Sequence, residues 1–429
     1  MSKTPYMIIG NGVAAVAAVA GIRSADDRGP ITLIAREPHH TYSKPLISYL
    51  LGGVVEEEQL LYRPRDFYRS NGVSPLLGLE VARVDPGRGI VETTDGEERS
   101  FGRLLIATGG VPIVPPDVEA ADATGVFTLT TLEDARNIKG YIEARGLEEA
   151  LVVGGGLIGM KSTEALVELG IRTTVVELAD RILSTTFDRT AGELALRQLR
   201  EAGVTVHCGT TVRRIRTRKG EVDGAVLRDG TRLSCRLVIF AIGVVPNVDI
   251  VRGTDVQTDR GILVDETMQT SVGGIYAAGD VAQADDLLGA GKRAIPIFPD
   301  AFRQGLVAGS NMAGRRRLYR GGIPMNSVDI FGLPTISVGL TDPEGGGYEV
   351  LTALDEGEPS YRKIVLQNNK VVGAIFIGCI DRAGIVTGLI REQVDVSDFK
   401  DALPTEDFGL ISLPRVYRKH VVSGMGIEV

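Results

Sequence analysis

The stretch YMIIGNGVAA, residues 6–15, decides the fold of the first part of the chain. A short apolar strand ends in a glycine turn with Gly10 and Gly12, an alanine-rich helix pattern follows, and a second strand at 31–34 leads to Glu37. This order is typical of the βαβ unit that binds a dinucleotide. The glycines allow a tight turn and let backbone N–H groups approach a pyrophosphate, which the helix N-terminus stabilises. Glu37 is placed to accept hydrogen bonds from ribose hydroxyls.

The same order occurs again in ALVVGGGLIG, residues 150–159, where a helix pattern and a strand at 173–176 lead to Glu177. The glycines of this second turn are Gly154, Gly156 and Gly159. One such turn alone could be an ordinary tight βα turn. Two copies, each with strand, helix and acid in register, predict two dinucleotide-binding domains of the Rossmann type.

Each unit is followed by a further pair of similar segments. Residues 103–112 resemble residues 236–247, and both read as buried strands that end in a Gly/Pro turn. Short strand patterns at 81–84 and 89–93 predict a β-meander inserted before the first of these segments. Residues 212–227 and 231–233 predict the same insertion in the second unit.

Composition excludes several classes of function. The chain has 429 residues, which is too long for one ordinary core, and a net charge of −8, which argues against nucleic acid as a partner. Its three cysteines are scattered without a CxxC pair, which favours a reducing compartment. No apolar run is long enough for a membrane span and none reads as a signal peptide, so we expect a cytoplasmic protein. The tandem His39-His40 lacks partners at metal-ligand spacing, so no metal is assigned.

The stretch TSVGGIYAAGDV, residues 270–281, carries a family resemblance. Together with the two glycine units, it resembles the pyridine nucleotide–disulfide oxidoreductase flavoproteins over about residues 1–390. The resemblance implies FAD in the first unit and NADH in the second. In the family, an aspartate at the position of Asp280 binds the ribityl chain of FAD, and Gly279 lets that chain approach. The cofactor-binding residues expected on these grounds are Gly10, Gly12, Ala15, Glu37, Lys44, Pro45, Thr108, Gly109, Gly279, Asp280, Phe298, Gly154, Gly156, Gly159, Glu177 and Gly243.

The order of these pieces predicts an α/β protein with one domain inserted in another. The FAD-binding domain is expected at 1–115 and 247–322, with the NADH-binding domain at 116–246 between its halves. Strand patterns at 331–340, 361–367 and 370–376 predict a C-terminal α+β domain at 323–429. In the family, such a domain closes the flavin site and often supports dimerisation. The chain is thus expected to be a homodimer or a subunit of a larger complex.

Glu177 bears on the choice between NADH and NADPH. A carboxylate at this position accepts from the ribose 2′-hydroxyl and repels a 2′-phosphate. The residues after it run Leu178-Ala179-Asp180 before Arg181, whereas NADP-type relatives tend to have basic residues here. We therefore expect NADH.

The helix near the flavin is expected in TYSKPLISYLLGG, residues 41–53. Pro45 suits a first helical turn, but Lys44 at the same end opposes the helix dipole. Disulfide reductases and single-cysteine relatives carry cysteine on this helix, whereas here Lys44 stands roughly at the single-cysteine position. At residues 42–46 the chain instead resembles rubredoxin reductases, ferredoxin reductases and the flavin module of NADH-dependent nitrite reductases. In these relatives a lysine lies beside flavin N5, paired with a glutamate at the position that Lys161 occupies here. Lys44 and Lys161 are the predicted catalytic residues.

Phe298 precedes a helix that, in the family, points its N-terminus at the flavin pyrimidine ring. The expected function is hydride transfer from NADH to FAD, followed by electron transfer to a separate rubredoxin, ferredoxin or iron–sulfur subunit. Two alternatives stay open: an NADH oxidase that reduces dioxygen, and a redox-sensing or assembly subunit that holds FAD and NADH without sustained turnover.

Overall fold

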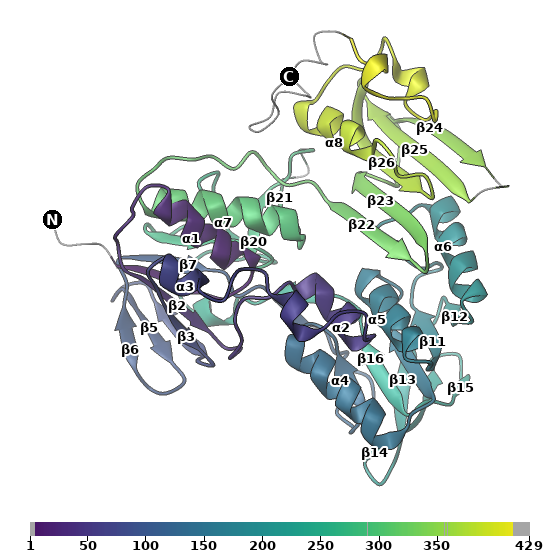
Figure 1. Ribbon diagram of the computed structural model, residues 1–429, viewed down its shortest axis with the longest axis horizontal. Coiled ribbons are helices and arrows are strands. Elements are labelled where there is room, and N and C mark those ends of the chain that lie inside the picture. The colour runs from purple at the N-terminus through teal and green to yellow at the C-terminus, as the bar shows by residue number, and fades with distance from the viewer. Residues whose placement is uncertain (1–4, 290, 356, 358, 415–429) are drawn as a thin grey trace. The chain divides into compact units, whose positions relative to one another are not determined.

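The computed structural model describes residues 5–289, 291–355, 357 and 359–414 (Figure 1). Contacts divide the chain into two compact units. The first contains Met1–Pro116, Val126–Leu147 and Ile239–Ile323, and the second contains Asp117–Gly125, Glu148–Val238 and Pro324–Val429. Each unit is described by itself below.

The core of the first unit is a parallel sheet with strand order β19-β7-β1-β2-β3. Its strands are β1 (Tyr6–Ile9), β2 (Ile31–Ala35), β3 (Val73–Leu77), β7 (Arg103–Ile106) and β19 (Ile275–Ala277). All four residues of the central strand β1 are buried, as expected for consecutive apolar side chains in a parallel sheet that is covered on both faces. The predicted first βαβ unit is therefore confirmed as β1-α1-β2.

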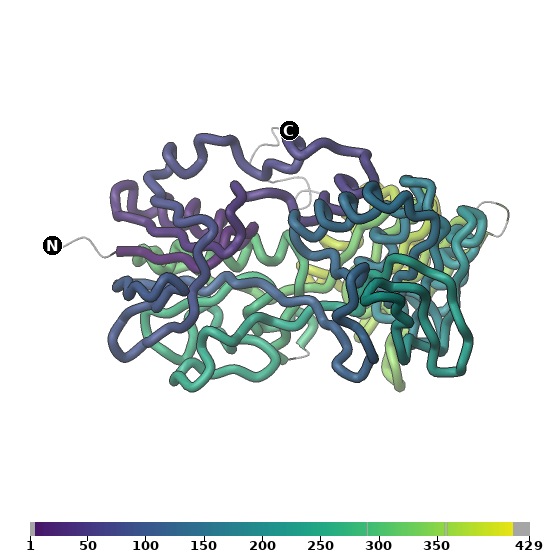
Figure 2. Tube along the Cα trace, turned by 90° about the horizontal axis from the view of Figure 1, so that it is seen from below, coloured from purple at the N-terminus to yellow at the C-terminus, as the bar shows by residue number. Residues whose placement is uncertain are grey.

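Helices α1 (Val13–Arg23) and α7 (Phe298–Met312) pack side by side, although they are far apart in sequence (Figure 1). The purple and green traces of these regions also run close together in the second view (Figure 2). A Cβ atom added at Gly305 would lie 2.1 Å from the carbonyl oxygen of Ala14. A Cβ at Gly309 would lie equally close to that of Ala18. Only glycine permits this approach of the two backbones.

Smaller elements complete the first unit. Strands β4 (Val81–Asp85), β5 (Ile90–Thr93) and β6 (Glu98–Ser100) form the predicted antiparallel meander. Strand β8 (Gly110–Pro112) pairs with β17 (Val244–Pro246). Short helices α2 (Ile47–Leu51) and α3 (Phe67–Ser70), helix α4 (Leu132–Arg145) and strand β9 (Val126–Thr128) lie outside the main sheet of this unit, as do β18 (Ile262–Leu263), β20 (Ala282–Asp285) and β21 (Lys292–Arg293).

The second unit repeats the βαβ order. Strand β10 (Glu149–Val153) is followed by α5 (Leu157–Glu168) and β11 (Arg172–Glu177), which pairs in parallel with β10. Helix α6 (Arg189–Glu201) leads to β12 (Thr205–Cys208), which extends this sheet beyond β11. Strands β13 (Val212–Arg218), β14 (Glu221–Leu227) and β15 (Arg232–Leu233) form the second predicted meander, and β16 (Leu237–Phe240) returns to the sheet beside β10. The second βαβ prediction is thus confirmed as well.

The C-terminal part of this unit is an antiparallel sheet with strand order β22-β23-β26-β25-β24 and helix α8 (Ala383–Glu392). Strands β23 (Leu333–Gly339), β25 (Ser360–Gln367) and β26 (Lys370–Ile377) lie where the sequence predicted them. Asn368 and Asn369 both have positive φ, 51° and 58°, as expected for the tight hairpin turn between β25 and β26. The sequence reading missed β22 (Met325–Ile330) and β24 (Glu349–Asp355), because neither shows a regular apolar alternation.

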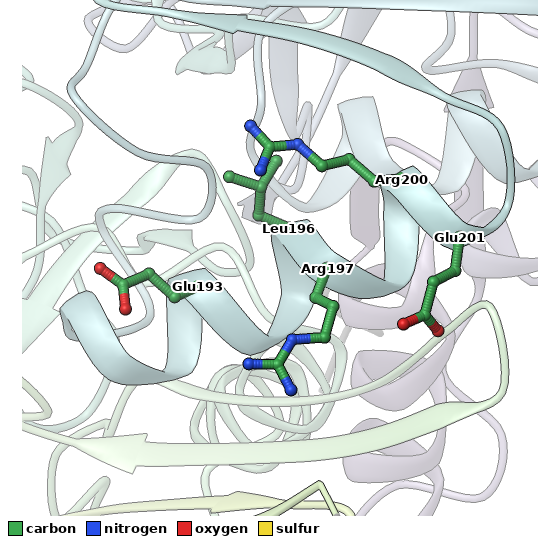
Figure 3. A pocket seen from close by; sticks show the side chains of 5 residues that line it. All are labelled: Glu193, Leu196, Arg197, Arg200 and Glu201. Carbon is green, nitrogen blue, oxygen red and sulfur yellow. The ribbon is translucent and has the colours of Figure 1, made fainter. Parts of the chain in front are cut away.

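No helix in the described ranges is long and apolar enough to cross a membrane. A surface pocket lies along α6 and is lined by Glu193, Leu196, Arg197, Arg200 and Glu201 (Figure 3). None of the predicted site residues lines it, so we assign it no function.

Candidate dinucleotide and flavin sites

The first glycine turn has the geometry of an anion cradle. Gly10 has φ 117°, and a Cβ there would lie 2.1 Å from the carbonyl oxygen of Ala107. Gly12 is the N-cap of α1 and has no side chain that could cap the helix. A Cβ atom added there would meet no atom within 4 Å. Open space thus faces the first N–H groups of a helix that has no capping side chain, which suits a pyrophosphate. Ala15 is fully buried in the first turns of α1 and keeps this end against the core.

Glu37, after β2, joins two other side chains. Its Oε2 accepts a hydrogen bond from Tyr42 Oη at 2.5 Å, and its Oε1 accepts one from Lys44 Nζ at 3.1 Å. Tyr42 Oη in turn accepts from the Leu132 N–H at the start of α4, at 3.0 Å. Burial and the neighbouring Glu37 raise the pKa of Tyr42 well above its ordinary value, so its hydroxyl stays protonated and donates. The three side chains pin the 41–46 loop.

Lys44 and Pro45 begin a short 3₁₀ turn (Lys44–Leu46) that leads directly into α2. The Glu37 carboxylate offsets the unfavourable placement of Lys44 at a positive helix end. This contact also bears on the predicted roles, which place Glu37 on a ribose and Lys44 beside flavin N5. The two groups are in contact here, so both roles can hold together only if the half-exposed Lys44 side chain moves away from Glu37.

Asp280 lies at the turn that follows β19. Burial raises the pKa of its carboxyl group, and the charge of Lys44 opposes that rise. In the described part of the chain, no other residue hydrogen-bonds to this carboxylate, which is only partly exposed. Gly279 has φ 81°, and a Cβ there would lie 3.1 Å from that of Ala14 in α1. A sheltered acceptor without a protein donor fits the hydroxyls of a ribityl chain.

Thr108, Gly109 and Gly243 lie where the two similar crossover segments meet. Thr108 Oγ1 donates to the carbonyl oxygen of Asn247 at 2.8 Å, and the Asn247 N–H donates to the carbonyl oxygen of Gly109 at 2.9 Å. Gly109 and Gly243 both have positive φ, 69° and 112°. These bonds join the segments that flank the β8–β17 ribbon to each other.

Phe298 is the first residue of α7 and is half-buried, so it is not a core aromatic. Its ring makes an edge-to-face contact with Tyr62, with centroids 5.0 Å apart. The N-cap of this helix, Ile297, provides no side-chain bond. Pro299 has no N–H, and the N–H groups of Asp300 and Ala301 donate to the carbonyl oxygen of Ile297. The start of α7 therefore offers a bound flavin the N–H of Phe298, beside a partly exposed ring.

The second glycine turn repeats the first. Gly154 has φ 113°, and a Cβ at Gly159 would lie 1.9 Å from the carbonyl oxygen of Gly154. Gly156 is the N-cap of α5, and its Cβ direction is open. Glu177 accepts from the N–H groups of Gly155 at 2.5 Å and of Ala179 at 2.7 Å. Its carboxylate is therefore held at the mouth of the turn.

Lys161 does not stand alone on α5. Its Nζ pairs with Glu164, one helical turn later, and donates to the carbonyl oxygen of Asp329 at 3.3 Å. Glu164 also accepts from the N–H of Phe331 at 3.0 Å. Together they tie α5 to the β22–β23 turn, a role that the sequence reading missed. The i,i+3 spacing of opposite charges is a signal for the Lys161–Glu164 pair, although not for its contacts with Asp329 and Phe331.

Of the three cysteines, Cys235 is buried, and Cys208 and Cys379 are partly exposed. Burial raises the pKa of Cys235 to about 12 and raises that of Cys208 as well. Both of these residues and Cys379 belong to the second unit, so the first unit contains no cysteine. A thiol relay in the unit that carries Asp280 is therefore excluded.

Comparison with known proteins agrees with this fold. Residues 4–305 match the family described as pyridine nucleotide-disulphide oxidoreductase, and residues 324–394 match the rubredoxin NAD+ reductase C-terminal domain. The epsilon subunit of NADH-dependent phenylglyoxylate dehydrogenase from Aromatoleum evansii is 35% identical, over 93% of this chain and 94% of its own. Nitrite reductase [NAD(P)H] from Bacillus subtilis is 28% identical over 93% of this chain, which spans about half (48%) of that protein. The solved structure of the covalent putidaredoxin reductase–putidaredoxin complex superposes with a TM-score of 0.87, 26% identity and coverage of 98% and 99%.

Two nucleotide-type glycine turns, the Asp280 turn and these matches together define a two-dinucleotide flavoprotein. The chain belongs to the pyridine nucleotide–disulphide oxidoreductase family. Within that family it is an NADH-dependent flavoprotein oxidoreductase that uses FAD and NADH. As in the resemblance drawn from its sequence, its relatives include rubredoxin reductase-type enzymes.

Proposed function

We propose that this oxidoreductase passes the electrons of NADH to a separate electron-carrier protein or iron–sulfur subunit of the rubredoxin or ferredoxin type. The observation that carries the proposal is the absence of cysteine from the first unit, which removes the thiol acceptor that disulfide-reducing relatives use. FAD, when bound, supplies hydride acceptance from NADH and release of single electrons. We place the enzyme in the cytoplasm, either as a homodimer or as a subunit of a larger complex.

The residues of this chain have distinct proposed parts. The turns at Gly10 and Gly154 hold the two dinucleotides, and Asp280 accepts from the FAD sugar chain. Lys44, once its side chain has moved away from Glu37, places a positive charge at the flavin site, where it favours the negative reduced form. Lys161, already neutralised by Glu164, orients the start of α5 instead of adding a second free charge.

Anaerobic and aerobic stopped-flow experiments test this function. Mixing the holoenzyme with NADH without oxygen is expected to bleach the flavin absorbance within one turnover time. Subsequent mixing with oxidised rubredoxin or ferredoxin should restore it much faster than mixing with air. Air reoxidation at the turnover rate would establish the NADH oxidase instead, and absence of bleaching would establish the sensing or assembly subunit.

Glu177 predicts the nucleotide preference. The wild-type enzyme is expected to have a kcat/KM for NADH at least about 10-fold above that for NADPH, because a 2′-phosphate would lie against a fixed carboxylate. In Glu177→Gln the preference should narrow, because the amide still accepts from Gly155 but carries no charge. Steady-state rates with both nucleotides measure this, and a wild-type preference for NADPH would contradict it.

A further inference from the structure

A buried hydrogen-bond chain lies directly behind the Asp280 turn, and it belongs to none of the motifs described above. Gln304, on α7, is only 2% exposed and contacts the turn through its carboxamide. Its Oε1 accepts the N–H of Gly279 at 2.8 Å. This N–H is the backbone donor next to Asp280, and without Gln304 it would be a buried donor without a partner.

The other end of the carboxamide is fixed by a buried acid. Gln304 Nε2 donates to Asp300 Oδ2 at 3.2 Å, and Tyr319 Oη donates to the same oxygen at 2.6 Å. Arg303 Nη2 donates to Asp300 Oδ1 at 2.9 Å. The side chain of Asp300 has no exposed surface, so its charge depends on these three donors.

The two ends of Gln304 agree on a single orientation. A backbone N–H can only donate, so it requires the oxygen of the carboxamide. An ionised carboxylate can only accept, so it requires the nitrogen. The buried acid in the first turn of α7 therefore determines which way Gln304 faces, and Gln304 in turn holds Gly279.

We propose that Gln304, oriented by Asp300, is a positioning residue that holds the Gly279-Asp280 turn ready for FAD before the cofactor binds. It acts through the backbone and does not itself contact the cofactor. The inference rests on the proposed assignment of Asp280 as an FAD ligand. It adds residues to that site that act from behind the turn. The position of the Asp280 carboxylate then depends on hydrogen bonds that run from Gly279 through Gln304 and Asp300 to Arg303 and Tyr319.

Titration of apoprotein with FAD, followed by flavin fluorescence, tests the proposal. Gln304→Leu is expected to bind FAD about 10- to 100-fold more weakly, because it leaves the Gly279 N–H buried and unpaired. Asn311→Leu is the matched control. It also removes a hydrogen-bonding carboxamide from α7, at the other end of the helix, where Asn311 bonds to the carbonyl oxygens of Thr267 and Arg317. That control should lower the melting temperature and leave the FAD dissociation constant within about twofold.

A double-mutant cycle separates positioning from general damage. If Gln304 acts through the turn, Gln304→Leu should weaken FAD binding much less in an Asp280→Asn background than in the wild type. Equal, additive losses in both backgrounds would overturn the proposal. If Asp280→Asn alone has no effect on FAD binding, the assignment of Asp280 fails; if only Gln304→Leu has none, the positioning role fails.

Exchanging the carboxamide of Gln304 and the carboxylate of Asp300 tests the proposal even if Gln304→Leu does not fold. Gln304→Glu alone places two carboxylates together in the core and should weaken FAD binding. Combining it with Asp300→Asn again places one donor and one acceptor in the contact between the side chains at 300 and 304. The double variant should recover at least half of the FAD affinity, as fold-change, that Gln304→Glu loses. Failure of the exchanged pair to recover any affinity, in a folded protein, would contradict the orientation argument.

Discussion

Asp280→Ala is expected to weaken FAD binding by about 100-fold. The carboxylate is sheltered, receives no hydrogen bond from other described residues, and has its pKa raised by burial. Hydroxyl groups that donate to this carboxylate would offset the cost of burying its charge without a donor. They would form charge-assisted hydrogen bonds, each of which contributes about 1.5–3 kcal/mol. Loss of roughly 3 kcal/mol corresponds to the stated factor. The measurement is the FAD dissociation constant of the apoprotein.

A graded series sharpens this prediction. Asp280→Asn keeps an acceptor without charge, so its loss should fall between wild type and Asp280→Ala. Asp285→Ala is the control, because it removes a carboxylate from β20 that is half exposed and paired with Lys292. Exposed ion pairs contribute about 0–1 kcal/mol, so the control should bind FAD almost normally. An unchanged dissociation constant in Asp280→Ala would show that the cofactor is held without this residue.

The fold was predictable because its decisive signals are local. The two glycine turns require positive φ or close backbone contacts at Gly10, Gly154 and Gly159, and these requirements appear directly as residue types. The parallel strands read as continuous apolar runs because both faces of the sheet are covered. Strand β24 escaped prediction because it is an exposed edge strand, with no buried face to impose a pattern.

The candidate site was less predictable, because its side chains meet through tertiary contacts. Nothing in the spacing of Glu37, Tyr42 and Leu132 shows that they share hydrogen bonds. The same holds for Gln304 and Gly279, which come from different elements. The residues expected to bind FAD and NADH stay predictions, which binding experiments test. The expected boundaries of the three domains also stay predictions.

The largest loss of stability is expected from Asp188, which links the nucleotide-binding part of the second unit to its C-terminal sheet. Asp188 is the N-cap of α6, where its Oδ1 accepts from the Ala191 N–H at 3.0 Å. Its Oδ2 accepts from Tyr361 Oη at 2.7 Å and from Lys363 Nζ at 2.9 Å, both on β25. The Lys363 and Asp188 side chains are 8% and 10% exposed. Burial and Asp188 raise the pKa of Tyr361 well above its ordinary value, so its hydroxyl stays a donor.

Asp188→Ala is expected to destabilise this unit by about 3–5 kcal/mol, because it leaves the Lys363 ammonium buried without its main partner and removes a helix cap. For a unit of this size, that loss lowers the melting temperature by roughly 6–20 °C. Asp342 lies 3.6 Å from the same ammonium but is 47% exposed, so Asp342→Ala should cost less than about 1 kcal/mol. Differential scanning calorimetry of both variants makes the comparison, and equal losses would contradict the buried-pair argument. Asp188→Asn combined with Lys363→Met removes both charges, keeps the cap, and should recover most of the stability that Asp188→Ala loses.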